Sequence, residues 1–136
     1  MSPAIQVLLL FTVLTLVLAV VYVGFRVTRV LAGQAKANAW TRGAPEYQDP
    51  AWVRRFEHAH MNCLENLPVY AAVVLAAYML GQVSLLDSLA FVFLAGRLFQ
   101  TVVHLISAGP IFVLMRATGL VVQWVVLAYW LYLLLG

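Results

Sequence analysis

Residues 54–68 read RRFEHAHMNCLENLP and form the densest polar cluster in a chain of 136 residues that is 65% hydrophobic. The cluster leads directly into an apolar stretch that continues to about residue 80. A helix over residues 50–81 would be roughly 45 Å long at ~1.5 Å per residue, which exceeds the ~30 Å hydrocarbon core of a bilayer. Its first turns are therefore expected to stand at the membrane interface, where polar side chains can be hydrated.

Composition places the whole chain among integral membrane proteins. Only 10% of the residues are charged and the mean hydropathy is +0.96, which is too apolar for a soluble domain of this size. Three further apolar runs each have the length of a bilayer-spanning helix. The sequence thus predicts one all-α membrane domain over residues 1–136, a bundle of four transmembrane helices. The expected helices cover residues of about 4–30, 50–81, 86–107 and 111–135.

The basic residues are unevenly distributed, which predicts the orientation of the chain. Six of the eight lie between the first two apolar runs: Arg26, Arg29, Lys36, Arg42, Arg54 and Arg55. Because cytoplasmic loops are enriched in Lys and Arg, this connection is expected inside and both termini outside. No basic patch is interleaved with exposed aromatic residues, so no nucleic-acid partner is expected.

The start of the second helix is predicted from two adjacent residues. Asp49 is expected to be the N-cap, with Pro50 at the first helical position. Pro68 lies inside the same helix, which membrane helices tolerate when neighbouring groups satisfy the freed carbonyl.

Two polar stripes on neighbouring helices indicate a shared site. At about 100° per residue, the second helix places five polar side chains on one stripe: Arg55, His58, Asn62, Glu65 and Asn66. The third helix places four polar side chains on one face: Arg97, Gln100, Thr101 and His104. Because lipid cannot satisfy such groups, the stripes are expected to face each other or a hydrated cavity. His60 lies nearly opposite the first stripe.

Arg97 falls near the middle of the third helix, and therefore near mid-membrane. An unpaired arginine at that depth costs at least ~3 kcal/mol. Glu65 is the acidic residue available within the spans, so we expect Arg97 and Glu65 to form a structural ion pair, within one subunit or between two. The two positions are offset by about 10 Å in depth, so Arg97 would have to reach toward the cytoplasmic side.

The polar stretch resembles the MAPEG superfamily, the membrane-associated proteins of eicosanoid and glutathione metabolism, and is most similar to its bacterial members. The resemblance is sharpest at Arg55, Ala59-His60, Asn62, Glu65-Asn66-Leu67-Pro68, Arg97 and Arg116. It implies a four-helix subunit that forms a homotrimer among the lipids of the bacterial inner membrane. It also implies that glutathione binds as co-substrate at the cytoplasmic side, between helices of adjacent subunits.

The resemblance further implies which side chains hold glutathione. Those that match the family's motif, or lie beside it, are His60, Asn62, Glu65, Arg55 and Arg29. Three positions depart from the family pattern: His58 replaces an Arg, Gln100 replaces a His, and His104 replaces a Tyr. We expect His58 and Gln100 to contact glutathione as well.

Two residues are the candidates for catalysis at the glutathione sulfur. Nearby cations lower the pKa of a thiol and so favour the thiolate, which is the nucleophile. Arg116 is expected near the sulfur by its family position, and His104 by its place in the Tyr position. A neutral His104 would donate one N–H, and a protonated one would stabilise the thiolate directly.

Several of these residues also have a purely structural interpretation. His60 alternatively bonds a backbone carbonyl of a neighbouring helix, and His104 alternatively satisfies the last carbonyls of its own helix. Arg116 alternatively anchors its helix at the interface. His58, His60 and Cys63 are spread around the second helix, so no metal site is expected.

The sequence and the resemblance together predict a membrane-bound glutathione-dependent transferase or peroxidase. Its activated thiolate would act on lipophilic electrophiles or peroxides that enter from the membrane. Two alternatives remain open. One is a non-catalytic protein that binds glutathione or a lipid. The other is a small transporter subunit in which Arg97 and Glu65 lie on an ion path.

Overall fold

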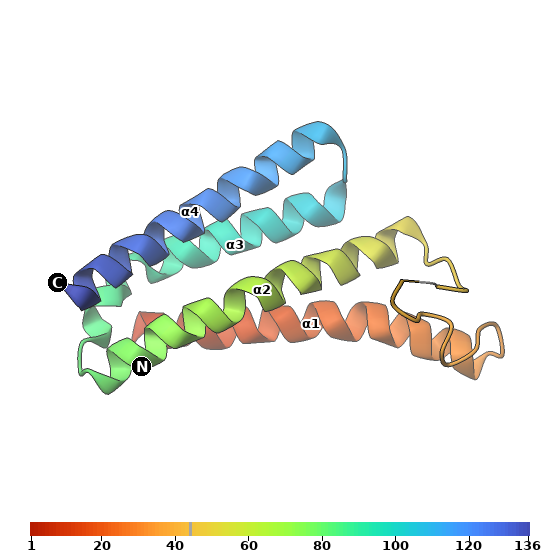
Figure 1. The fold of residues 1–136 in the computed structure, drawn as a ribbon, viewed down its shortest axis with the longest axis horizontal. Coiled ribbons are helices and arrows are strands. Elements are labelled where there is room, and N and C mark those ends of the chain that lie inside the picture. The colour runs from red at the N-terminus through yellow and green to blue at the C-terminus, as the bar shows by residue number, and fades with distance from the viewer. Residues whose placement is uncertain (44) are drawn as a thin grey trace.

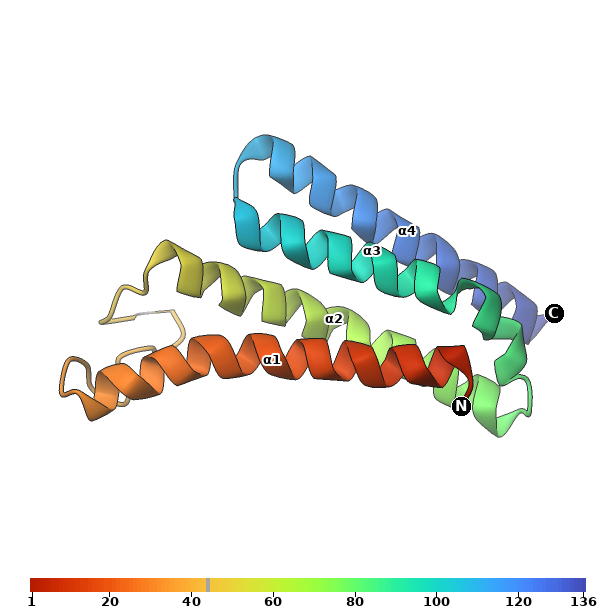
Figure 2. The same cartoon turned by 180° about the vertical axis from the view of Figure 1, so that it is seen from behind.

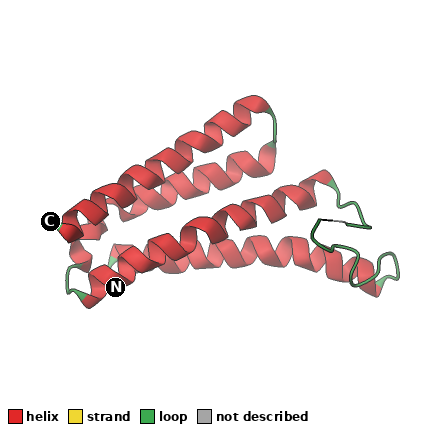
Figure 3. Cartoon of the chain, viewed as in Figure 1, coloured by secondary structure: helices red, strands yellow, loops and turns green. Residues whose placement is uncertain are grey.

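The computed structural model describes residues 1–43 and 45–136. These residues form four long α-helices and one short 3-10 helix, and the described part of the chain contains no strand (Figure 3). The elements are α1 (Pro3–Leu31), α2 (Ala51–Met79), η1 (Val83–Leu86), α3 (Asp87–Ile106) and α4 (Pro110–Leu135). Each predicted helix range ends within two residues of these bounds.

The helices are arranged as two antiparallel hairpins, α1 with α2 and α3 with α4 (Figure 1). The hairpins meet near η1 and diverge toward their other ends, as the view from behind also shows (Figure 2). Both chain termini lie at the η1 end, and the connection 32–50 lies at the opposite end. Most of the polar residues in the two stripes of α2 and α3 lie in the halves of these helices nearer the diverging end.

Within the described residues, three helical segments are long and apolar enough to cross a membrane: Pro3–Leu31, Val83–Ile106 and Pro110–Leu135. The helix α2 does not meet the same criterion because its first half carries the charged cluster 54–68. It runs antiparallel beside α1 (Figure 1) and so returns the chain to the side on which α1 began. The structure confirms the predicted fold class, an all-α membrane protein with four long helices.

An aromatic core closes the bundle in the half near the termini. It contains one fully buried ring from each long helix: Phe11, Tyr70, Phe93 and Trp130. The rings of Tyr70 and Phe93 are 4.3 Å apart between centroids, and the others lie within aromatic contact distance. At the same end Asp87 accepts hydrogen bonds from the Ser2 hydroxyl and from the Ala4 amide at 3.0 Å. These contacts hold the two hairpins together at this end.

The start of α2 differs from the prediction. Pro50 is the N-cap, and no side chain caps the helix. The carboxylate of Asp49 instead accepts hydrogen bonds from Arg26 at 2.6 and 2.9 Å and from the Trp40 indole at 2.9 Å. Arg26 also pairs with Glu57 at 2.7 Å. An ion pair with a guanidinium is stronger than a cap to a neutral amide, so Asp49 ties the connection 32–50 to α1.

The helices α3 and α4 approach closely at two glycines. A Cβ atom added to Gly119 would lie 2.8 Å from the carbonyl oxygen of Gly96. One added to Gly96 would lie 3.1 Å from the carbonyl oxygen of Gly119. Small residues at helix contacts in membranes allow this kind of backbone approach, and here it determines how side chains of α3 and α4 meet.

Candidate functional site

A pocket with a volume of about 390 Å³ lies between α2, α3 and α4, in the half of the bundle nearer the connection 32–50. Its lining residues are His58, Asn62, Gln100, His104, Val113, Arg116, Ala117 and Leu120. The two stripes expected from the sequence thus contribute to one hollow, and α4 adds the third wall. No acidic residue is among these lining side chains, so the polar part of the wall consists of amide, imidazole and guanidinium groups.

His104 is the centre of the polar wall. Its Nδ1 atom lies 2.6 Å from Nη1 of Arg116 and 3.2 Å from Nδ2 of Asn62. A guanidinium can only donate hydrogen bonds, so Nδ1 accepts and we infer that the imidazole is neutral, with its proton on Nε2. Of the two states considered from the sequence, the geometry favours the neutral donor. The ring of His58 lies 6.1 Å from that of His104 between centroids.

Gln100 is held by a residue that the sequence analysis missed. The Oε1 atom of Gln100 accepts a hydrogen bond of 3.0 Å from Nε2 of Gln123, which is completely buried. A signal for Gln123 was present in the sequence, because Arg116, Leu120 and Gln123 follow one another at i, i+4 and i+7 and therefore share a face of α4. One amide in an otherwise apolar helix was not enough to indicate a functional residue.

The sequence of the whole chain matches a known family. The model of the MAPEG family matches residues 4–136, essentially the whole chain. The chain belongs to the MAPEG family. No curated protein and no solved structure matches it. Membership makes this an integral membrane protein of the kind associated with glutathione and eicosanoid metabolism, in agreement with the three apolar helices.

Five of the residues expected from the MAPEG resemblance line the pocket, and others do not. His60 faces α1, where its Nδ1 lies 2.9 Å from the carbonyl oxygen of Thr15 and its ring lies 5.6 Å from that of Tyr22. A carbonyl only accepts, so this His60 nitrogen donates. This position corresponds to the structural interpretation of His60. The contact of His60 with glutathione stays a prediction.

The two arginines expected as anion contacts also lie outside the pocket lining of the single MAPEG subunit. Arg55 donates from Nε to the carbonyl oxygen of Leu105 at 2.8 Å, which ties α2 to the last turn of α3. Arg29 lies at the end of α1, where it hydrogen-bonds Gln34 and stands 4.7 Å from the centroid of the Phe25 ring. Arg55 therefore lies beside the turn that carries His104, although it does not line the pocket, whereas Arg29 lies at the far end of α1.

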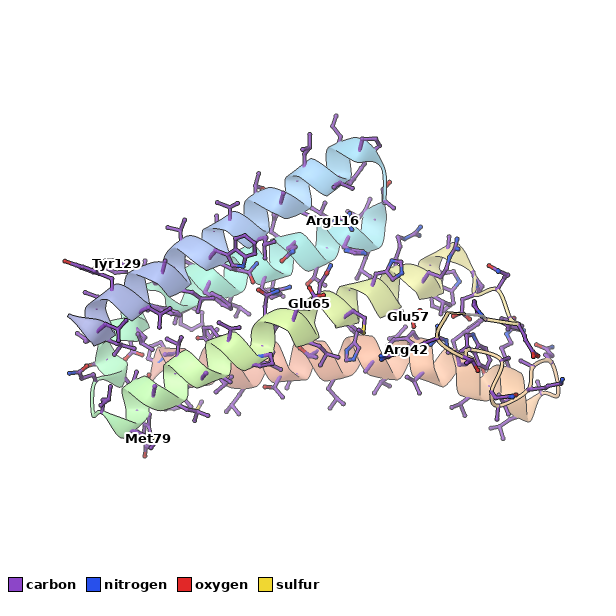
Figure 4. The ribbon with its side chains drawn as sticks, in the orientation of Figure 1. Arg42, Glu57, Glu65, Met79, Arg116 and Tyr129 are labelled. Atoms are coloured by element: carbon purple, nitrogen blue, oxygen red, sulfur yellow. The ribbon has the colours of Figure 1, made fainter. Side chains whose placement is uncertain are left out.

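The expected ion pair between Arg97 and Glu65 is absent from the ion pairs of the described residues. Arg97 is completely buried, and its Nη1 donates to the carbonyl oxygen of Asn62 at 3.4 Å. Its guanidinium carbon lies 4.9 Å from the centroid of the Phe11 ring, a geometry that attracts a cation. Glu65 is exposed near the middle of α2 (Figure 4). Arg97 is buried and Glu65 is exposed, so the two do not pair within one chain. A pair between two subunits stays a prediction.

Proposed function

We propose that this MAPEG protein binds glutathione with its sulfur in the pocket between α2, α3 and α4, and that the activated thiolate attacks lipophilic electrophiles or peroxides. The observation that supports this most directly is the contact of 2.6 Å between Arg116 and His104 in a pocket without lining carboxylates. Such a wall offers a bound sulfur one guanidinium and several N–H donors, and no carboxylate that would repel an anion. It therefore stabilises a thiolate relative to the thiol.

The proposed chemistry needs few protein groups. The thiol proton passes to water at the mouth of the pocket, and Arg116 together with the Nε2–H of His104 stabilises the sulfur anion. With an electrophile, the sulfur forms a bond to carbon and the leaving group departs with its electron pair. With a hydroperoxide, the sulfur attacks the distal oxygen, the O–O bond breaks, and the products are an alcohol and glutathione sulfenic acid. A second glutathione then converts the sulfenic acid to the disulfide and water.

A homotrimer is part of the proposal, because one face of α2 is not suited to lipid. Glu65 is exposed there among large apolar side chains, including Met61, Leu64 and Val69. An unpaired carboxylate facing hydrocarbon is costly, whereas the surface of a second copy could satisfy it. In the trimer, Glu65 of one subunit would be available to the glutathione ammonium. Light scattering of the detergent complex should give the mass of three chains of 15.1 kDa; a monomer mass would reject the trimer.

The first prediction is that Arg116→Ala lowers turnover of glutathione with a lipophilic aryl halide about 100-fold, the effect typical of removing a donor to a developing or bound anion. Glutathione-induced thermal stabilisation of the detergent-purified protein should decrease much less, because the peptide part of the ligand keeps its contacts. Lys36→Ala, at an exposed residue between α1 and α2, is the control.

Two results would contradict the proposal. An unchanged rate in Arg116→Ala would remove Arg116 from the chemistry. Glutathione binding by the wild type without conjugation or peroxide reduction would instead support the non-catalytic alternative.

A further inference from the structure

Gln123 is a buried amide beside the pocket that no step of the proposed chemistry uses. Its side chain is inaccessible to solvent, and its Nε2 makes two hydrogen bonds, one to the carbonyl oxygen of Gly119 at 2.8 Å and one to Oε1 of Gln100 at 3.0 Å. Its Oε1 has no partner among the described residues. A buried polar atom without a partner in a native structure calls for an explanation.

The backbone decides which way both amides point. The Gly119 carbonyl accepts only, so the atom of Gln123 that contacts it must be the nitrogen. This nitrogen then has no lone pair to offer Gln100, so the atom of Gln100 that contacts it must be the oxygen. Because the oxygen of Gln100 accepts this hydrogen bond, the Nε2 hydrogens of Gln100 point away from Gln123. Gln100 lines the pocket, and its Nε2 has no protein partner in the described part of the chain.

We propose that Gln123 is a positioning residue that fixes Gln100 as a hydrogen-bond donor in the pocket and so makes the site selective for an anionic sulfur group. This inference rests on the proposed function. It adds that the orientation of the Gln100 amide makes the pocket prefer an anionic sulfur group to a neutral one. Without Gln123, the amide of Gln100 could rotate and present its oxygen, which would repel a thiolate. The close approach of Gly96 and Gly119 brings Gln123 within reach of Gln100.

Two glutathione analogues test this polarity directly. Glutathione sulfonate carries a negative charge at the sulfur, and S-methylglutathione carries none there, while the rest of each ligand is the same. The measured quantity is the ratio of the two Kd values, S-methylglutathione over sulfonate, determined by titration of the detergent-purified protein. Changes that only loosen the fold should weaken both ligands and leave this ratio unchanged.

The variants Gln123→Met and Gln100→Met should each lower the ratio about 5-fold, in line with the loss of one donor to an anion. Because Gln123 acts through Gln100, the double variant should show no further decrease, which is the signature of coupled residues. Thr118→Ala, on an exposed part of α4, should leave the ratio unchanged. If Gln123→Met does not fold, Gln123→Asn keeps a neutral amide on a shorter side chain that no longer reaches Gln100, and it should lower the ratio in the same way.

The outcomes separate the two proposals. If the wild type binds neither analogue, the proposed function is wrong and this inference fails with it. If the wild type binds both but the Gln123 variants keep the wild-type ratio, the function stands and the positioning role is wrong. Additive effects in the double variant would also overturn it, because Gln123 would then act independently of Gln100.

Discussion

At the scale of single residues, Arg97 shows how a membrane bundle accommodates a charge without a carboxylate. Its guanidinium is completely buried, and its Nε and Nη2 atoms have no hydrogen-bond partner among the described residues. The guanidinium contacts the carbonyl oxygen of Asn62 and the face of the Phe11 ring, and both carry partial negative charge. Carbonyl and ring contacts of this kind partly replace the hydration that an arginine loses in the membrane.

We therefore expect Arg97 and Phe11 to be energetically coupled. In a double-mutant cycle with Arg97→Met and Phe11→Leu, the coupling in the free energy of unfolding should be about 1–2 kcal/mol, the strength of a desolvated cation–π contact. Denaturation in mixed micelles measures it. Phe99→Leu, which changes an exposed ring on the same helix as Arg97, is the control and should show no coupling. Independent effects of the first pair would mean that the ring does not stabilise the charge.

At the scale of elements, the contact between α3 and α4 positions the site. Gly96 and Gly119 allow the two backbones to approach, and Arg116 and Gln123 lie on the turns of α4 on either side of Gly119. His104 and Gln100 of α3 are their partners. The pocket wall thus depends on the separation of two helices, and a small increase in that separation would break both contacts.

The substitution Gly119→Ala tests this dependence. Gly119→Ala would place a Cβ atom 2.8 Å from the Gly96 carbonyl oxygen and 3.1 Å from Cβ of Gln100, so the helices must move apart. We expect a loss of about 1–3 kcal/mol in the free energy of unfolding, as for other overpacked contacts, together with weaker glutathione binding. Thermal unfolding in detergent and ligand titration measure the two effects.

Gly24→Ala is the matched control, because a Cβ atom at this helical position of α1 meets nothing within 4 Å. It should be neutral or stabilise the protein by up to about 1 kcal/mol through helix propensity. Equal behaviour of the two variants would show that the glycine contact does not hold α3 against α4.

At the scale of the whole molecule, the two ends of the bundle differ in chemistry. The end with the termini is closed by the aromatic core, and exposed side chains such as Met79 and Tyr129 point away from the bundle there (Figure 4). The other end carries the connection between α1 and α2 (Figure 1), which contains basic residues, and the polar pocket lies in the same half of the bundle. By the positive-inside rule, we propose that this second end faces the cytoplasm, where glutathione would be supplied.

Cysteine labelling tests that orientation. On a Cys63→Ala background, Gly136→Cys should react with a membrane-impermeant maleimide in intact cells, because the C-terminus would be outside. Lys36→Cys should react only after the cells are lysed. Labelling of Lys36→Cys in intact cells would reverse the orientation. Equal labelling of both sites would contradict their placement at opposite ends of the bundle (Figure 2).

The fold class, the four long helices and the polar stripes could be predicted from the sequence, because hydropathy and helical periodicity depend on residues close together in the chain. The same local pattern identified four of the polar side chains that line the pocket, and the MAPEG resemblance indicated the family and Arg116. The expected N-cap at Asp49 was wrong, because its carboxylate is bound by Arg26, which lies 23 residues earlier in the chain.

Only the tertiary structure decided which polar residues meet. The rotation and separation of packed helices arise from contacts between distant segments, such as Gly96 with Gly119, and no local pattern records them. In the packed bundle, His60 faces α1 and Arg97 is buried against Phe11. Gln123, which the sequence did not indicate as a site residue, contacts Gln100. The sequence by itself determined that the chain forms a bundle of membrane helices and which polar residues those helices carry. The packing of the helices determined which of these residues come together in the pocket.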